Sequence, residues 1–309
     1  MHDFPDFYDP QRIGTLYYPD VARIADHAQR NNLPPAAQDG QKVHLLIIDM
    51  QVDFCHPGGS LYVPGAEGDI RRLIEFIYRH AGRISQITCS LDSHLPHQIF
   101  HPAWWADAAG NHPAPFTLIT YEDALAGQWR PLQHAEGSLE YMRRLEAEAK
   151  KTLTIWPYHV MIGSMGNALD PELFSAVLWH SLARQAEPHW LTKGSIPFTE
   201  HYSIIQPEVP LPDQPQGGKN QAFLQMLAEA DAMIIAGEAS SHCVLETVED
   251  LLEEFGQQPD ILRRIYFLSD CTSPVVHPEV DFAAIAQARF AEFAAQGVNF
   301  IKSTDSLPF

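Results

Sequence analysis

The stretch "VHLLIIDM", from Val43 to Met50, decides the fold that this sequence predicts. Its near-continuous run of apolar residues is typical of a strand buried on both faces, and such strands occur in parallel sheets. The strand is expected to end at Asp49. The loop that follows, "QVDFCHPGGSLYVPGA", is rich in glycine and proline, and an amphipathic helical pattern then begins near residue 70.

Strand and helix patterns alternate along the rest of the chain. Further strands are expected at residues 84–91, 189–193, 232–237, 264–270 and 298–301. Helices are expected at 19–30, 70–77, 138–150, 171–186, around 223–227, and at 243–255 and 280–295. This alternation predicts an α/β fold, a doubly wound three-layer sandwich with a mostly parallel sheet of about six strands. We expect one domain over residues 1–309, with an N-terminal extension (1–41) and insertions near 100–153 and 163–188.

Composition narrows the class of protein. Of the 309 residues, 45% are hydrophobic and 19% charged, which suits a folded domain. The 39 acidic residues outnumber the 20 basic ones and give a net charge of −19, so we expect neither nucleic acid nor membrane as a partner. Four cysteines without a C-x-x-C pair, no signal-peptide pattern and no long apolar run favour a cytoplasmic protein.

Three residues at the predicted strand ends form a candidate catalytic set. Cys243 follows the strand at 232–237 and opens a helix, where free N–H groups and the helix dipole would lower the pKa of its thiol. Asp49 can take the thiol proton as a general base, and Lys193 can hold Asp49 ionised. The alternative for Cys243 is a small buried residue with no chemical role.

The segments "IIDMQVDFCHPGGSLYVPGA", "LTKGS" and "AGEASSHCVLETVEDLL" resemble the isochorismatase-like cysteine hydrolases, nicotinamidases in particular. The resemblance implies a catalytic triad of Asp49, Lys193 and Cys243. It also implies a non-proline cis peptide at Glu238–Ala239, with the N–H groups of Ala239 and Cys243 forming an oxyanion hole. The implied reaction is hydrolysis of a carboxamide, with nicotinamide or a related heteroaromatic amide as the leading substrate.

A metal site is the second expectation. In "LDSH", Asp92 and His94 are two positions apart at a strand end, which puts both side chains on one face. The resemblance adds His159, in "WPYHV", as the third ligand. One divalent ion is expected, zinc first, with iron or manganese as alternatives. His97 and His101 follow closely and compete for a ligand role.

The resemblance is weaker around the pocket. Ser93 stands where nicotinamidases usually have tryptophan, and Val160 replaces a cysteine. Phe54 matches the family's pocket aromatic residue, and we expect it and Ser93 in the pocket. Trp104 and Trp105 either line the pocket or anchor the core of the insertion.

Alternatives to a nicotinamidase remain open. They are an amidase for a larger amide, a non-catalytic binding protein with the same fold, and a non-haem iron oxygenase using the three metal ligands. The partner is a small-molecule amide in the leading interpretation, and self-association into a homo-oligomer is an expectation from the resemblance.

Overall fold

The six predicted strands form a sheet in the computed structural model, which describes residues 4–149 and 151–309. They are β1 (Val43–Ile48), β2 (Gln86–Asp92), β7 (His189–Lys193), β8 (Ala232–Gly237), β9 (Ile265–Leu268) and β10 (Asn299–Ile301). Every neighbouring pair in this sheet is parallel, in the order β10-β9-β8-β1-β2-β7. The predicted doubly wound α/β fold is confirmed.

The central strand β1 shows why its sequence reads as continuously apolar. All six of its residues are buried, and their side chains alternate between the two faces of the sheet. Leu45 and Ile47 pack into one hydrophobic cluster, whereas Leu46 and Ile48 pack into the other. A strand with a core on each side carries no polar face, which is the pattern of "VHLLII".

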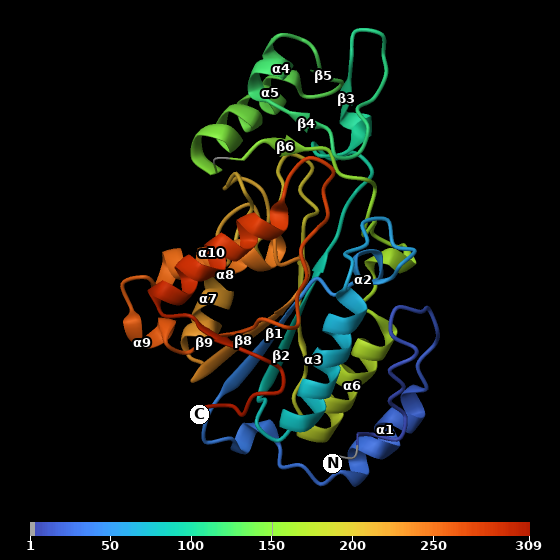
Figure 1. Ribbon diagram of the computed structural model, residues 1–309, viewed down its shortest axis with the longest axis vertical. Helices are drawn as coiled ribbons and strands as arrows, with labels where there is room; N and C mark the ends of the chain where they lie inside the picture. The colour runs from blue at the N-terminus through green and yellow to red at the C-terminus, as the bar shows by residue number, and fades with distance from the viewer. Residues whose placement is uncertain (1–3, 150) are drawn as a thin grey trace.

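Helices cover both faces (Figure 1). One face carries α3 (Ala66–His80) and α6 (Pro171–Arg184), with α1 (Val21–Arg30) packed on α6. The other carries α7 (Gln221–Ala228), α8 (Cys243–Phe255) and α10 (Phe282–Gln296), and the short α9 (Pro259–Leu262) precedes β9. Helix α6 occupies much of the predicted second insertion, and it serves as the crossover between β2 and β7.

The insertion after β2 folds above the carboxyl ends of the strands, at the top of Figure 1. It contains more structure than the single predicted helix. Two small antiparallel pairs join β3 (Trp105–Ala106) to β5 (Arg130–Pro131) and β4 (Leu118–Ile119) to β6 (Leu153–Thr154). Helix α4 (Tyr121–Leu125) precedes α5 (Ala135–Arg144), which continues as a π-helical segment, η3 (Leu145–Ala149). The predicted end of this helix, residue 150, lies outside the described residues.

The sheet changes direction of winding between β1 and β8. From β1 the chain adds β2 and then β7 on one side, and β8, β9 and β10 follow on the other. Ligands of such folds bind beyond the carboxyl ends of the strands at this switch point.

Of the predicted N-terminal extension, residues 1–3 are outside the described part of the chain. Among the described residues, no helix has the length and apolarity needed to cross a membrane.

Candidate active site

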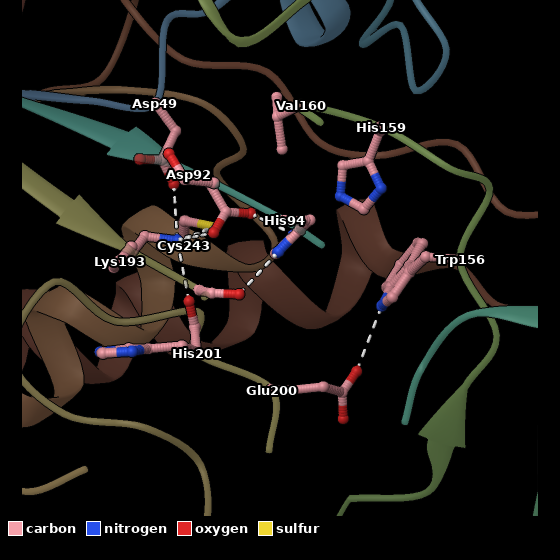
Figure 2. A network of polar contacts seen from close by, with 12 residues as sticks. Asp49, Asp92, His94, Trp156, His159, Val160, Lys193, Glu200, His201 and Cys243 are labelled. Atoms are coloured by element: carbon pink, nitrogen blue, oxygen red, sulfur yellow. Dashed lines mark hydrogen bonds and ion pairs between the residues drawn. The ribbon is translucent and has the colours of Figure 1, made fainter. Parts of the chain in front are cut away.

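The strand register brings the three predicted catalytic residues together. Asp49 directly follows β1, and Ile48 is paired with Gly237 at the end of β8, six positions before Cys243. Lys193 ends β7, opposite Asp92 at the end of β2. All these side chains therefore reach the same edge of the sheet, where Figure 2 shows them converging.

Lys193 is the centre of the polar contacts. Its ammonium group lies 2.9 Å from Asp49 Oδ2 and 3.2 Å from Asp92 Oδ1. It also donates to the backbone carbonyl of His201 at 2.8 Å and to Cys243 Sγ at 3.6 Å. Burial by itself would lower the pKa of Lys193, but the two carboxylates outweigh burial and raise it. Lys193 therefore remains a cation in a buried site.

Asp49 is held in place by hydrogen bonds with Ser90. It is fully buried, with its backbone in the left-handed region (φ 47°). The Ser90 hydroxyl donates to Asp49 Oδ1 at 2.5 Å, and the Asp49 N–H donates to Ser90 Oγ at 3.0 Å. Burial raises the pKa of Asp49, although the charge of Lys193 opposes this rise. A carboxylate with a raised pKa is a stronger base than an exposed aspartate.

Cys243 is the first residue of α8, as the sequence predicts, and is 7% exposed. The expectation of a lowered thiol pKa is wrong. Burial raises the pKa of Cys243 well above its ordinary value, and Asp49 raises it further, whereas Lys193 lowers it. The resting residue is therefore a neutral thiol beside a base, rather than a standing thiolate.

The two residues of the expected oxyanion hole, Ala239 and Cys243, follow β8 and begin α8. The peptide bond between Glu238 and Ala239 is cis. Within residues 4–149 and 151–309, no hydrogen bond is made by the N–H of Ala239 or of Cys243. Both residues line the pocket. Two free donors beside the thiol can stabilise negative charge on a substrate oxygen.

Asp92, His94 and His159 form a candidate metal site, with one ligand atom from each lying within 4.8 Å of the others. The Nδ1 atom of His94 bonds to the Gly194 carbonyl at 2.9 Å, and that of His159 bonds to the Pro157 carbonyl at 2.7 Å. Such a bond at Nδ1 is the usual outer support of a histidine ligand, and it leaves Nε2 as the ligand atom. Nε2 of His94 lies 2.8 Å from Asp92 Oδ2, a second candidate ligand. The donor set fits a divalent transition metal.

The charge of Asp92 also suits a ligand. Burial would raise its pKa, but His94 and Lys193 outweigh burial and hold the pKa below its usual range. The segments that carry the two histidines are tied together, because the N–H of His94 donates to the Val160 carbonyl at 3.1 Å. A second backbone hydrogen bond runs from the Ile162 N–H to the His94 carbonyl at 3.0 Å, so two direct contacts join segments that lie far apart in the sequence.

Gly194 closes the base of this site. Its φ is +83°, and a Cβ atom added there would lie 2.2 Å from Asp92 Oδ1 and 2.8 Å from His94 Cε1. Its carbonyl accepts hydrogen bonds from both His94 and Gln98. The glycine of the "TKG" segment is therefore required by the closeness of two candidate ligands.

Two competing histidines lie outside the set of three. His97 is exposed. His101 is fully buried, with ring centroids 5.8 Å from His94 and 6.2 Å from His159. It does not belong to the group of residues whose ligand atoms lie within reach of one ion.

The pocket above these residues comprises about 460 Å³ of space, part of it open to solvent, and is lined mainly by aromatic and histidine side chains. Phe54 lines it and contacts His159 edge to face at 5.4 Å. Ser93 does not line it. Its side chain points to the opposite face from its two neighbours, where it bonds to the Leu91 carbonyl and to Asn167.

Trp104 and Trp105 do not line this pocket either. Both are buried in the insertion, where their indole N–H groups donate to Ser138 Oγ at 3.0 Å and to the Ile99 carbonyl at 2.6 Å. Of the two alternatives, the structure supports the role of anchoring the insertion. The physical reason is that each ring finds its hydrogen-bond partner inside the insertion.

Sequence reasoning missed a polar wall of the pocket, formed by Trp156, Glu200, Tyr202 and His242. The rings of Trp156 and Tyr202 contact His242 edge to face, at 5.2 and 5.3 Å. Trp156 stands three positions before His159, in the segment already quoted, so its place in the motif was a usable signal. No sequence signal pointed to Glu200, because its surroundings are formed by segments that are distant in the sequence.

Solved structures with this fold include nicotinamidases. A yeast nicotinamidase bound to the inhibitor nicotinaldehyde aligns with a TM-score of 0.57 and 19% sequence identity, over 84% of this chain and 99% of that one. An Acinetobacter nicotinamidase pyrazinamidase gives 0.55 and 18%, over 87% and 100%. No protein-family model and no curated protein matches the sequence. The chain thus has the fold of nicotinamidases, as the sequence predicts.

Proposed function

We propose that this protein is a cysteine amidohydrolase that converts a carboxamide into a carboxylate and ammonia. One observation carries the proposal: the buried ammonium group of Lys193 contacts both Asp49 and the thiol of Cys243, and Cys243 lines the pocket. A nucleophile, a base and an orienting cation in contact are the elements of covalent catalysis.

The reaction begins with proton transfer. Asp49 takes the proton of Cys243, and the sulfur attacks the carbonyl carbon of the substrate. Negative charge moves to the carbonyl oxygen, where the N–H groups of Ala239 and Cys243 can donate to it. Removing one such donor typically slows an enzyme by about 10²–10³. Lys193 stabilises the negative charge as it moves between Asp49 and the sulfur.

The tetrahedral intermediate then collapses. Asp49 returns its proton to the amide nitrogen, the carbon–nitrogen bond breaks, and ammonia leaves a thioester on Cys243. Asp49 next removes a proton from a water molecule, whose oxygen attacks the thioester carbon. The carbon–sulfur bond breaks, the sulfur regains a proton, and the carboxylate product departs.

Asp92, His94 and His159 would hold the metal ion, with zinc as the first candidate and iron or manganese as alternatives. A bound ion would act as a Lewis acid that binds and orients a donor atom of the substrate. The protein residues supply the nucleophile and the proton transfers.

Nicotinamide or a related heteroaromatic carboxamide is the leading substrate. Two features support it: the pocket is compact and aromatic, and the solved structures with this fold include nicotinamidases. A larger or different amide is the second candidate, because Trp156, Glu200 and Tyr202 place polar groups in the pocket wall.

The test is ammonia release from a panel of carboxamides by the wild type, by Cys243→Ala and by Cys89→Ala. Cys89 is also buried, but it lies in β2, outside the pocket. Loss of turnover in Cys243→Ala alone would support the mechanism. Native turnover by that variant would refute it.

A further inference from the structure

A buried carboxylate forms part of the pocket wall and has no role in the mechanism above. Glu200 is 3% exposed and lines the pocket. It lies in the loop after β7, seven residues beyond Lys193. Figure 2 shows it on the side of Trp156, away from both Cys243 and His159.

Three neutral groups donate to this carboxylate. Trp156 Nε1 donates to Oε1 at 3.2 Å, and the Tyr202 hydroxyl donates to the same oxygen. The Tyr141 hydroxyl, from α5 of the insertion, donates to Oε2 at 3.1 Å. These donors come from three separate segments of the chain, so the orientation of the carboxylate is set by the tertiary structure.

The acceptor capacity of Glu200 is not exhausted by these donors. An ionised carboxylate offers about four lone-pair sites, and three donors are present. Within the described residues, Glu200 forms no ion pair. Lys151 acts on it through space, but the ammonium group of Lys151 pairs with Glu208 and Glu246. A buried carboxylate without a bound cation favours a partner that brings an N–H donor or a positive charge.

We propose that Glu200 is a specificity-determining subsite, which accepts a hydrogen bond from an amino group on the part of the substrate remote from the scissile carboxamide. The preferred substrate class is then an amino-substituted aromatic carboxamide. This inference rests on the proposed function, because the carboxamide is placed at Cys243. The compact pocket suits it, since both residues line the same space.

Binding to a catalytically inert protein tests the subsite. The dissociation constants of 5-aminonicotinamide and 6-aminonicotinamide, and of the matching methyl derivatives, are measured by calorimetry on metal-loaded Cys243→Ala. The methyl group matches the amino group in size but cannot donate. At least one amino compound should bind about tenfold or more tightly than its methyl partner, because hydrogen bonds to charged groups are the stronger class.

The same ratio is then measured on Cys243→Ala/Glu200→Gln, which keeps one acceptor oxygen but loses the charge, so the ratio should fall severalfold. Tyr141→Phe, in the Cys243→Ala background, is the matched control: it removes one donor from Oε2 and leaves the carboxylate in place, so the ratio should persist. Glu200→Asp, which withdraws the acceptor by one methylene, replaces Glu200→Gln if that variant does not fold, and it should lower the ratio.

The subsite is refuted if no amino compound is preferred, or if the preference is undiminished in both Glu200→Gln and Glu200→Asp. Failure of the proposed function has a different signature, because the wild type would then release no ammonia from any carboxamide. Ammonia release without amino preference would therefore refute the subsite alone.

Discussion

Replacing Gly194 by alanine should abolish tight metal binding while leaving the protein folded. The added Cβ would lie 2.2 Å from Asp92 Oδ1 and 2.8 Å from His94 Cε1. Ordinary contacts of this kind begin near 3.4 Å, so the Asp92 oxygen has to move by about 1 Å. Metal–ligand distances in proteins lie within about 0.2 Å of their standard values. The required displacement is therefore several times larger than the site can absorb.

The expected loss of affinity is at least about 100-fold. Changes to residues that merely support metal ligands cost about 10–100-fold in affinity, and Gly194→Ala displaces two candidate ligands directly. Left-handed backbone adds about 1–2 kcal/mol of strain for any residue other than glycine. Gly110 is the matched control, because its φ is +89° and nothing lies within 4 Å of an added Cβ.

The assay is competition with a chelator for Zn²⁺, with metal content measured after dialysis and thermal melting of both variants. Gly110→Ala reports the backbone strain alone, and Gly194→Ala should lose more stability than this because its Cβ also collides with Asp92 and His94. Both variants should remain folded, and only Gly194→Ala should lose the metal. A Gly194→Ala protein that binds Zn²⁺ as tightly as the wild type would refute the placement of the metal at Asp92 and His94.

Three further predictions concern the base Asp49, the metal ligand His159 and the buried carboxylate of Asp250. Burial raises the pKa of Asp49, so kcat/KM should fall with decreasing pH at a pH above the ordinary pKa of an aspartate. Asp49→Asn should lower kcat by about 10²–10⁴ and remove this acid limb from the pH profile. His159→Ala should lose bound metal, measured by elemental analysis, whereas the exposed His97→Ala should keep it; equal retention would contradict the ligand assignment. Burial raises the pKa of Asp250 from 3.8 to about 6, so its charge destabilises the fold increasingly as pH rises through this interval. Asp250→Asn should therefore gain up to about 3 kcal/mol in urea unfolding at pH 8 and nothing at pH 3, and an equal gain at both values would contradict the burial effect.

The sheet and the chemical residues were predictable because they depend on local pattern. A strand such as "VHLLII" carries its two-sided burial in its composition, and parallel strands bring their carboxyl ends to one edge. Asp49, Lys193 and Cys243 could therefore be placed together without coordinates. The same reasoning placed Asp92 and His94 on one face.

The pocket wall was less predictable because it depends on contacts between distant segments. Trp104 and Trp105 look like ligand-facing aromatic residues in sequence, but their partners, including Ser138, lie inside the insertion. Glu200 shows the converse case, since an isolated glutamate in a loop gives no sign of burial. The pKa of Cys243 was also misjudged, because the depth of burial cannot be read from a position at a helix end.

The insertion above the sheet has an evolutionary consequence. The residues that would do the chemistry stand on the strand ends of the sheet, whereas Tyr141 and Trp156 of the wall come from the inserted segment and the stretch that returns from it. A substitution in the inserted segment can therefore alter the pocket wall while Asp49, Lys193 and Cys243 stay in place. Exchange of the inserted segment therefore offers a route to new substrates that does not alter the residues that carry out the reaction.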